Sequence, residues 1–389
     1  MIDGTRRPLT ATVAALVVAT AIGLAGVPAG AGSSKTVRIG VEAPLTGDQA
    51  TLGKGMLKGA QLAARRLNER DGIGGRRVEI VPIDDAADPE KGSEAASAAI
   101  AQGLDGVVGP YNSGVGAETL PLYIDAGLVP IRLTSADSTA GLGFTLQPMT
   151  SQIAPVAATA LTDWLGAKSV AIAYDPTALY TDTVSNQLRQ LLEQVGVTIT
   201  AFQPIEPGQK SYADVVRQLA ATNPDVIYAG TYYPEGGLIA KAVLAQHFDA
   251  KCVVDYGSYD QGYVEVAGVK AANACAVVGV PAPHEFPGAK KFVAAYRAAF
   301  RSAPGAWSPY TFDSVNLLAD AVEEAGGFDA AKLTDALDAV DGYEGWTGAV
   351  KLEPGSGNRE PATVVLLDTN RAGIFHIDHD WAQAVGYRP

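Results

Sequence analysis

Hydroxyl and aromatic side chains follow several of the strands that the sequence predicts, at the point where each strand ends. They are Tyr111, Asn112, Ser113, Thr134, Ser135, Tyr180, Tyr232, Tyr233, Glu235, Asp255 and Tyr256. In an open parallel sheet a ligand binds beyond the carboxyl ends of the strands, because helix N-termini and free loop amides converge there. This set contains no histidine, no cysteine and no evident acid–base pair. It therefore predicts a binding surface and not an enzyme, with no catalytic residue and no cofactor.

A glycine-rich stretch ahead of a helix imitates a dinucleotide-binding motif. The glycines are Gly53, Gly55 and Gly59, and the acidic residues that end the next strand are Asp84 and Asp85. The third glycine comes one residue late, and about ten residues separate Ala43 from Gly53, where the motif requires a tight turn directly after the strand. The chain also has no G-x-S-x-G motif, which excludes a serine hydrolase of that type.

Two stretches contain residue types that bind metals. His376–Asp380 holds two histidines and two aspartates, but successive side chains on a strand that begins at Ile374 point to opposite faces. We interpret this stretch as an exposed strand end followed by a turn. Residues 84–90 hold four acidic side chains and imitate a calcium cluster, yet Asp88 followed by Pro89 is typical of a helix N-cap. We predict no metal site.

The first residues have the composition of an export signal. Arg6 and Arg7 precede a run from Leu9 to Ser34 without any charged residue, and residues 29–31 supply the small side chains of a cleavage site. We predict a signal peptide over residues 1–31 and a soluble exported protein, periplasmic or extracytoplasmic. An uncleaved N-terminal anchor is the alternative.

Charge and cysteine content limit the partners further. The 389-residue chain has a net charge of -13, so we expect no nucleic-acid partner. Cys252 and Cys275 are the only cysteines, so no lipid-anchor cysteine is expected near the predicted cleavage site. In an exported chain such a pair predicts one disulfide, and each cysteine begins an apolar run typical of neighbouring strands. Two buried free thiols are the alternative.

Strands and helices alternate twice along the chain, in two similar runs. The first run has strands near 37–43, 78–83, 106–109 and 129–133, and the second has strands near 170–174, 197–202, 226–230 and at Cys252. Helices are expected between them, and again near 289–301, 308–326 and 329–340, before strands near 363–367 and 374–377. Residues 104–109 and 224–230 occupy equivalent steps in the two runs. This alternation predicts two doubly wound α/β lobes with parallel sheets.

The strand-helix-strand unit from Val37 to Asp85, with its double glycine at 74–75, resembles the opening of the Leu/Ile/Val-binding proteins, the solute receptors of ABC importers. The string G-T-Y-Y-P-E from Gly230 to Glu235 is close to the wording of the same family. The resemblance implies a type I periplasmic-binding-protein fold, with two Rossmann-like lobes joined by three hinge crossovers near 147–151, 281–284 and 357–361. Lobe 1 would contain residues 36–148 and 284–357, and lobe 2 residues 149–283 and 358–389.

The same resemblance implies what the protein does. It would be a monomer that closes its two lobes over a small amino acid, in particular a branched-chain aliphatic one, and delivers it to an ABC permease and ATPase complex. Two alternatives stay open: the same fold binding a non-amino aromatic or aliphatic carboxylate, or a ligand-sensing module for a signalling partner.

The resemblance also assigns roles to the strand-end residues. A serine and a threonine hold the ligand α-carboxylate in that family, which corresponds to Ser113 with Thr134 or Ser135, and two tyrosines correspond to Tyr180 and Tyr232. Tyr111 belongs to the same predicted pocket, and Leu52 would form its wall on the first lobe.

Three positions depart from the family pattern. Leu52 stands where well-known relatives have an aromatic residue, which suggests a different ligand shape. Tyr256 stands where the family commonly places a carboxylate for the ligand ammonium, so either Asp255 or Asp260 turns inward or the ligand has no amino group. Arg132 either contacts the ligand carboxylate or is a surface charge.

Overall fold

Five parallel strands form the first sheet of the computed structural model, which describes residues 36–387. In spatial order they are β2 (Arg77–Asp84), β1 (Thr36–Ala43), β3 (Gly106–Val108), β4 (Pro130–Arg132) and β5 (Phe144–Thr145). The apolar side chains of β1 are fully buried, as expected of a strand covered on both faces. The winding reverses between β1 and β3, and such a switch point is where open α/β sheets bind ligands. The predicted signal peptide lies outside the described residues.

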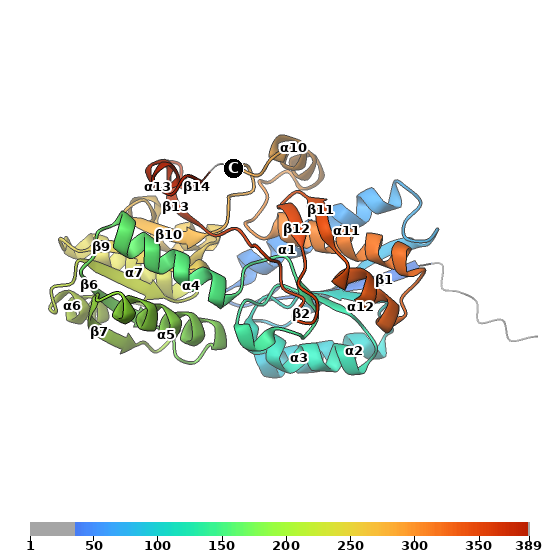
Figure 1. Ribbon diagram of the computed structural model, residues 1–389, viewed down its shortest axis with the longest axis horizontal. Helices are drawn as coiled ribbons and strands as arrows, with labels where there is room; N and C mark the ends of the chain where they lie inside the picture. The colour runs from blue at the N-terminus through green and yellow to red at the C-terminus, as the bar shows by residue number, and fades with distance from the viewer. Residues whose placement is uncertain (1–35, 388–389) are drawn as a thin grey trace, which may run out of the picture. The chain divides into compact units, whose positions relative to one another are not determined.

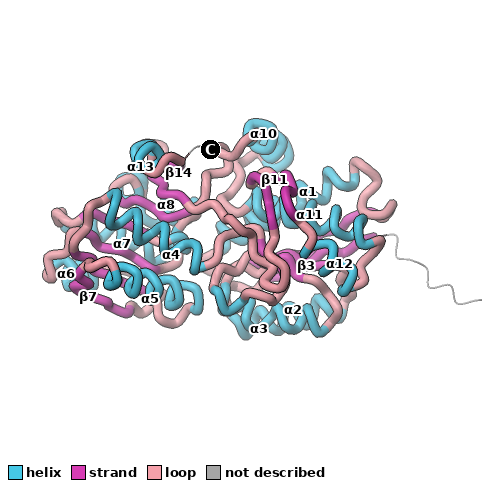
Figure 2. Tube along the Cα trace, viewed as in Figure 1, coloured by secondary structure: helices cyan, strands magenta, loops and turns pink. Residues whose placement is uncertain are grey.

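Helices cover both faces of this sheet. They are α1 (Ala50–Asn68), α2 (Pro89–Ala101), α3 (Ser113–Asp125), α10 (Ala289–Phe300), α11 (Ser308–Ala325) and α12 (Ala330–Asp338). Figure 1 shows α2 and α3 together on one side of the strands, with α1 and α11 on the other. A hairpin of β11 (Asp341–Gly345) and β12 (Gly348–Lys351) follows α12 and is drawn as a pair of strands in Figure 2.

The glycines that imitate a dinucleotide motif serve helix packing instead. A Cβ atom on Gly59 would lie 2.2 Å from the Ser308 carbonyl oxygen, so only glycine permits this approach of α1 to α11. Hydrogen bonds cross the same contact, from the Ser308 hydroxyl to the Gly55 carbonyl at 2.9 Å and from the Thr311 hydroxyl to the Met56 carbonyl at 2.8 Å. Gly53 is equally restricted by the Pro44 carbonyl oxygen.

The second sheet repeats the strand order of the first. In spatial order it contains β14 (Phe375–Ile377), β13 (Val365–Thr369), β10 (Cys275–Gly279), β9 (Lys251–Val254), β8 (Val226–Gly230), β6 (Ser169–Tyr174) and β7 (Thr198–Pro204). The strands β6 to β10 are parallel and follow the same order as β1 to β5, while β13 and β14 are antiparallel additions. β3 and β8 therefore occupy equivalent places, as the sequence predicts.

The helices of this part are α4 (Thr150–Thr159), which continues as a π-helical segment over Ala160–Trp164, α5 (Leu179–Gln194), α6 (Ala213–Ala220), α7 (Tyr233–Gln246), α8 (Gln261–Ala267), α9 (Val269–Ala272) and α13 (His379–Ala384). α4 packs against α5, and α6 and α8 pack against α7. The shorter segments of the chain are the 3₁₀ turns at Asp137–Thr139 and Tyr256–Ser258, and isolated bridges that pair Ile73 with Arg76 and Leu352 with Arg359. No helix within residues 36–387 combines the length and the apolar character that crossing a membrane requires.

The predicted disulfide is confirmed. Cys252 and Cys275 are register partners on the neighbouring strands β9 and β10, with their Cα atoms 4.6 Å apart. The predicted turn after the strand at 374–377 is wrong, because α13 begins there. Its N-cap is Asp378, whose carboxylate accepts the Trp381 N–H at 2.8 Å. α4 and the hairpin of β11 and β12 were also not predicted.

The chain crosses from the part that holds one sheet to the part that holds the other. These passages follow β5, β10 and β12. The third passage lies beside β5 and the segment just ahead of it, because the Gly141 N–H donates to the Ser356 carbonyl and the Thr145 N–H donates to the Gly357 carbonyl, both at 2.8 Å. The Arg359 guanidinium reinforces this contact with a bond to the Leu146 carbonyl at 3.1 Å.

Candidate functional site

The end of β3 delivers the first group of predicted site residues. Gly109 has a φ of +100°, and a Cβ atom there would lie 2.1 Å from the Glu42 carbonyl oxygen, so a glycine is required at this turn. The turn places Tyr111 just ahead of α3, which begins at Ser113. The Ser113 hydroxyl oxygen accepts the N–H groups of Ser135 at 3.2 Å and Ala136 at 3.0 Å. Its own hydrogen remains able to donate, at the positive end of a helix of 13 residues.

The second sheet contributes three tyrosines from equivalent strand ends. Tyr180 is the second residue of α5, Tyr232 caps α7, and Tyr256 begins the 3₁₀ turn after β9. Tyr232 and Ser113 line the same cavity. Burial raises the pKa of the Tyr232 hydroxyl, and hydrogen bonds with the Asn112 side chain and the Ser113 N–H oppose the shift. The tyrosines of one sheet thus face the helix terminus of the other.

One enclosed cavity collects most of the predicted site. It measures about 10 Å³ and is lined by Tyr111, Ser113, Leu133, Ser135, Tyr180, Tyr232 and Tyr256. Six of the nine predicted ligand-binding residues are in this set, and Leu133 is an addition. The other three, Thr134, Leu52 and Asp255, do not line it. The lining has hydroxyl groups and aromatic rings but no charged side chain.

The three residues outside the cavity have other contacts. The Thr134 hydroxyl bonds to the Thr139 hydroxyl at 2.7 Å, so Ser135 is the residue of this pair that reaches the cavity. Leu52 is buried in the apolar core on α1. Asp255 lies behind Tyr180, whose hydroxyl donates to its Oδ2 atom at 2.7 Å.

Asp255 forms the centre of a buried hydrogen-bond cluster. Its Oδ1 atom accepts the Tyr228 hydroxyl, and Oδ2 accepts the Gly257 N–H at 3.4 Å in addition to Tyr180. Burial raises the pKa of this carboxyl group, and the two tyrosine hydroxyls oppose the shift. The aspartate therefore orients Tyr180 from the side away from the cavity.

Trp307 was not predicted as a site residue; it does not line the enclosed cavity, but it packs against two tyrosines that do. It lies at the N-cap of α11 and is 1% exposed, and its ring centroid is 5.2 Å from that of Tyr111 and 5.3 Å from that of Tyr256. One signal in the sequence could have indicated it. Ser308 and Pro309 directly after Trp307 are typical of a helix start, and helix N-termini converge on the ligand edge of such sheets.

The two sides of the cleft are in contact. The Tyr233 hydroxyl donates to the Asp48 carbonyl at 2.6 Å, and the Gln187 amide donates to the Asp137 carboxylate at 2.7 Å. The Tyr256 hydroxyl bonds to Gln147 at 3.1 Å, in the first passage between the sheets. These bonds join segments on either side of the cavity and close it.

A larger cavity of about 620 Å³ lies beside the enclosed one and shares Tyr232 with it. We call it the cleft-mouth cavity. Its acidic lining residues are Asp48, Asp88, Asp175 and Glu235, and its basic lining residue is Lys91. The lining of this cavity is therefore predominantly negative.

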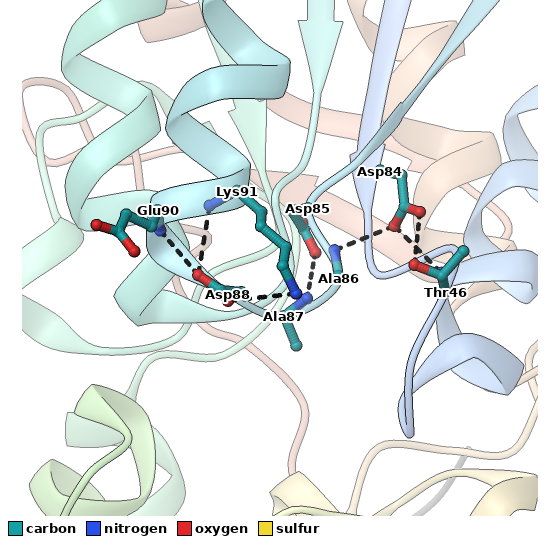
Figure 3. Close-up of polar contacts among 8 residues, drawn as sticks. All are labelled: Thr46, Asp84, Asp85, Ala86, Ala87, Asp88, Glu90 and Lys91. Carbon is teal, nitrogen blue, oxygen red and sulfur yellow. Dashed lines mark hydrogen bonds and ion pairs between the residues drawn. The ribbon is translucent and has the colours of Figure 1, made fainter.

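Residues 84–90 form hydrogen-bonded turns at this entrance (Figure 3). The Asp88 carboxylate accepts the N–H groups of Glu90 at 3.0 Å and Lys91 at 3.3 Å, which confirms its predicted role as the N-cap of α2. Asp84 accepts the Thr46 hydroxyl at 2.7 Å. No cluster of three or more metal-binding side chains is found among the residues that the structure describes.

The interpretation of Arg132 as a surface charge is wrong, and the structure gives no support to a ligand contact. The side chain is fully buried and does not line the enclosed cavity. Its Nη2 atom donates to the Asn358 side chain at 2.6 Å and its Nη1 atom to the Thr134 carbonyl at 3.2 Å. Burial lowers the pKa of the guanidinium to about 9. Arg132 thus ties β4 to the third passage between the sheets.

Comparison with known proteins identifies similar chains. A family model described as "Periplasmic binding protein" matches residues 36–368. The Leu/Ile/Val-binding protein homolog 2 of Brucella abortus is 27% identical over 318 residues, which cover 79% of this chain and 84% of that protein.

Two solved structures show the same fold. A leucine binding protein from Thermotoga maritima superposes with a TM-score of 0.81 at 22% identity, over 88% of this chain and 97% of that one. The branched-chain amino acid transporter substrate binding protein from Streptococcus pneumoniae, in complex with isoleucine, has a TM-score of 0.80 at 23% identity, over 88% and 99% of the two chains. The predicted fold class, two doubly wound lobes in the type I periplasmic-binding-protein arrangement, is confirmed.

Proposed function

This chain belongs to the periplasmic binding protein family, and from that membership we propose that it is the solute-binding component of an ABC importer. It acts outside the cytoplasm, binds one small solute between its lobes and passes it to a membrane permease and its ATPase. It catalyses no reaction. Relatives named for leucine, isoleucine and valine binding support a small amino acid as the ligand class, with branched-chain aliphatic ones first.

The observation that carries this proposal is the origin of the cavity lining. Tyr111, Ser113 and Ser135 follow strands of the first sheet, and Tyr180, Tyr232 and Tyr256 follow strands of the second. A ligand that touches both groups binds the closed form better than the open form and so shifts the population toward closure. The lobe boundaries at 148–149, 283–284 and 357–358 are part of this proposal.

The carboxylate of the ligand is assigned to the start of α3. The Ser113 hydroxyl is a free donor there, the N–H groups of the first turn are unpaired within the helix, and the helix dipole favours an anion. Ser135 is the second hydroxyl on this side of the cavity.

The test uses the mature protein, a panel of amino acids and their deaminated acids, and thermal unfolding. A ligand present at 100 times its dissociation constant stabilises by about 2.7 kcal/mol, which is readily measured. Ser113→Ala should weaken binding by about 1.5–3 kcal/mol, or roughly 10- to 150-fold, because it removes a hydrogen bond to a charged group.

Ser314→Ala is the matched control, since Ser314 is also a buried serine but does not line the cavity. It should leave binding unchanged. Equal affinity of wild type and Ser113→Ala would contradict the assignment of the ligand carboxylate to Ser113. Formation of a product from any bound compound would overturn the proposal as a whole.

A further inference from the structure

A groove of about 550 Å³ is lined by α10 and by the turn that joins β13 to β14, and we call it the α10 groove. Its volume lies within the range of roughly 300–1,000 Å³ that is typical of small-molecule sites. Its lining also includes residues 282–284 of the second passage and residues 303–306 ahead of α11. The α10 groove shares no lining residue with the enclosed cavity or with the cleft-mouth cavity, so it is a separate space.

One face of α10 gives the groove an apolar stripe with a basic residue at each end. The stripe consists of Lys290, Val293, Ala294 and Arg297, whose spacing of i, i+3, i+4 and i+7 places them on one side of a helix. Lys290 and Arg297 are separated by about 10 Å along the helix axis. An elongated molecule that lies along this face therefore contacts an apolar surface and meets a basic residue at its end.

The turn between β13 and β14 supplies further apolar side chains to the same groove. Ile374, just ahead of β14, is 48% exposed, and Phe375 begins β14. An apolar ligand body in the groove would cover Ile374 and remove its surface from water, which is favourable.

The basic residues of the α10 groove have no acidic counterpart in its lining. Lys290, Arg297 and His284 line it, and no aspartate or glutamate does. All three side chains are exposed, and none forms an ion pair within residues 36–387. The chain as a whole has a net charge of -13, so this lining is opposite in sign to the average of the protein. Such a lining attracts an anion.

Tyr259 adds a hydrogen-bond donor to the groove. It is 1% exposed, and its hydroxyl oxygen makes no hydrogen bond with any of the described residues. Burial raises the pKa of this hydroxyl, so the group stays protonated and able to donate. Its ring packs edge-on against Phe375, with the two centroids 5.0 Å apart. A buried polar group without a partner costs free energy, and an oxygen atom of a bound ligand would supply the partner.

We propose that the α10 groove is a second binding site, separate from the cleft, for a small amphiphilic anion: a carboxylate attached to an apolar body. The basic residues attract the carboxylate, and the Tyr259 hydroxyl donates to a ligand oxygen. The apolar body packs on the stripe of α10 and on Ile374. This site goes beyond the proposed function, which concerns a solute bound between the lobes, and the two proposals can fail independently.

The test measures the binding of three probes to the mature protein by calorimetry. Octanoate has a carboxylate and an apolar chain, acetate has a carboxylate without such a chain, and octylammonium has an apolar chain with the opposite charge. We expect octanoate to bind at least tenfold more tightly than acetate, because the chain buries apolar surface. We expect at least the same margin over octylammonium, because the lining repels a cation.

Two double variants of α10 locate the octanoate site. Lys290→Gln with Arg297→Gln removes both basic residues of the stripe, and it should weaken octanoate binding at least tenfold. Lys291→Gln with Arg301→Gln is the matched control, because it removes the same charge from the same helix and its C-cap at positions that do not line the groove. The control should weaken binding less than threefold.

Two further pairs test the apolar body and the hydroxyl. Ile374→Asn should weaken octanoate binding severalfold, whereas Ile124→Asn, at an exposed isoleucine outside the groove, should not. Tyr259→Phe should also weaken it severalfold. Tyr263→Phe should not, because Tyr263 is likewise buried with an unpartnered hydroxyl among the described residues but does not line the groove. Circular dichroism confirms that each variant is folded.

The outcomes are decisive for the α10 groove. The pattern above supports the proposal. Unchanged octanoate affinity in the Lys290 and Arg297 double variant overturns it, and so does an octanoate affinity that falls only in Ser113→Ala, because octanoate would then occupy the cleft. Absence of octanoate binding, or equal affinity for octanoate and octylammonium, also overturns it. None of these results contradicts the proposed function.

Discussion

Two buried carboxyl groups beside the cleft lead to a prediction about stability. Glu42, on β1, and Asp85, just after β2, are both fully buried. Glu42 accepts the Thr119 hydroxyl at 3.0 Å, and Asp85 accepts the Ala87 N–H at 2.8 Å through Oδ1. The other oxygen of each group accepts no hydrogen bond from the described residues. Burial raises the pKa of both groups, and the neighbouring Asp85 raises that of Glu42 further.

The size of the expected change in stability follows from Asp85, whose pKa rises from 3.8 to about 7. Because the folded-state value is the higher one, the folded protein binds the extra proton between about pH 4 and 7, and stability falls as the pH rises through that window. The full difference corresponds to about 4 kcal/mol once the group is ionised. Asp85→Asn removes the charge, so we expect it to stabilise the protein by a few kcal/mol at pH 8 and by about 2.5 kcal/mol less at pH 5.

The assay is urea unfolding of wild type and variant at pH 5, 6, 7 and 8. Asp84→Asn is the matched control, since Asp84 is the adjacent residue with the opposite behaviour (Figure 3). Burial opposes its ionisation, but hydrogen bonds from Thr46, Ala86 and Leu45 outweigh burial and lower its pKa. Asp84→Asn should therefore destabilise the protein at pH 8. This loss of stability should become smaller as the pH falls below about 4. A stability difference between Asp85→Asn and wild type that is constant from pH 5 to 8 would refute the reasoning.

Two further predictions concern closure and the disulfide. Tyr233→Phe removes the bond from its hydroxyl to the Asp48 carbonyl across the cleft, so ligand affinity should fall about 2- to 10-fold, or 0.5–1.5 kcal/mol. Tyr212→Phe is the control, because its hydroxyl bonds to the Glu206 carbonyl on the same side; calorimetry should detect no such loss. Replacing both Cys252 and Cys275 by serine should lower the free energy of unfolding by about 3 kcal/mol without changing affinity, and an unchanged urea midpoint would contradict this.

Several features of the fold could be predicted because they are local in the sequence. The apolar runs and their spacing place the strands of both sheets, and the glycine at 109 marks the turn that delivers Ser113. The pairing of Cys252 with Cys275 also follows from their shared position at the start of two apolar strands. The missed elements lack such signals: α4 contains Pro155 in its interior, and α13 depends on the Asp378 cap.

The composition of the site was predictable only in part. Strand ends of a parallel sheet meet at one edge, so Tyr111, Tyr180 and Tyr232 were expected together and lie together. The choice between neighbours in a loop has no periodic signal, and the structure places Ser135 rather than Thr134 at the cavity. In the same way it places Tyr256 at the cavity and Asp255 behind it.

The sequence by itself thus determined the α/β architecture, the repeated winding and the edge at which a ligand binds, because hydrophobic periodicity and turn residues act over a few positions. Only the tertiary structure decided that Trp307 packs against Tyr111, almost 200 residues earlier in the chain. It also decided that Arg132 is internal and that Glu42 and Asp85 share one buried space. These contacts depend on how helices and strands distant in sequence pack together, which no local pattern encodes.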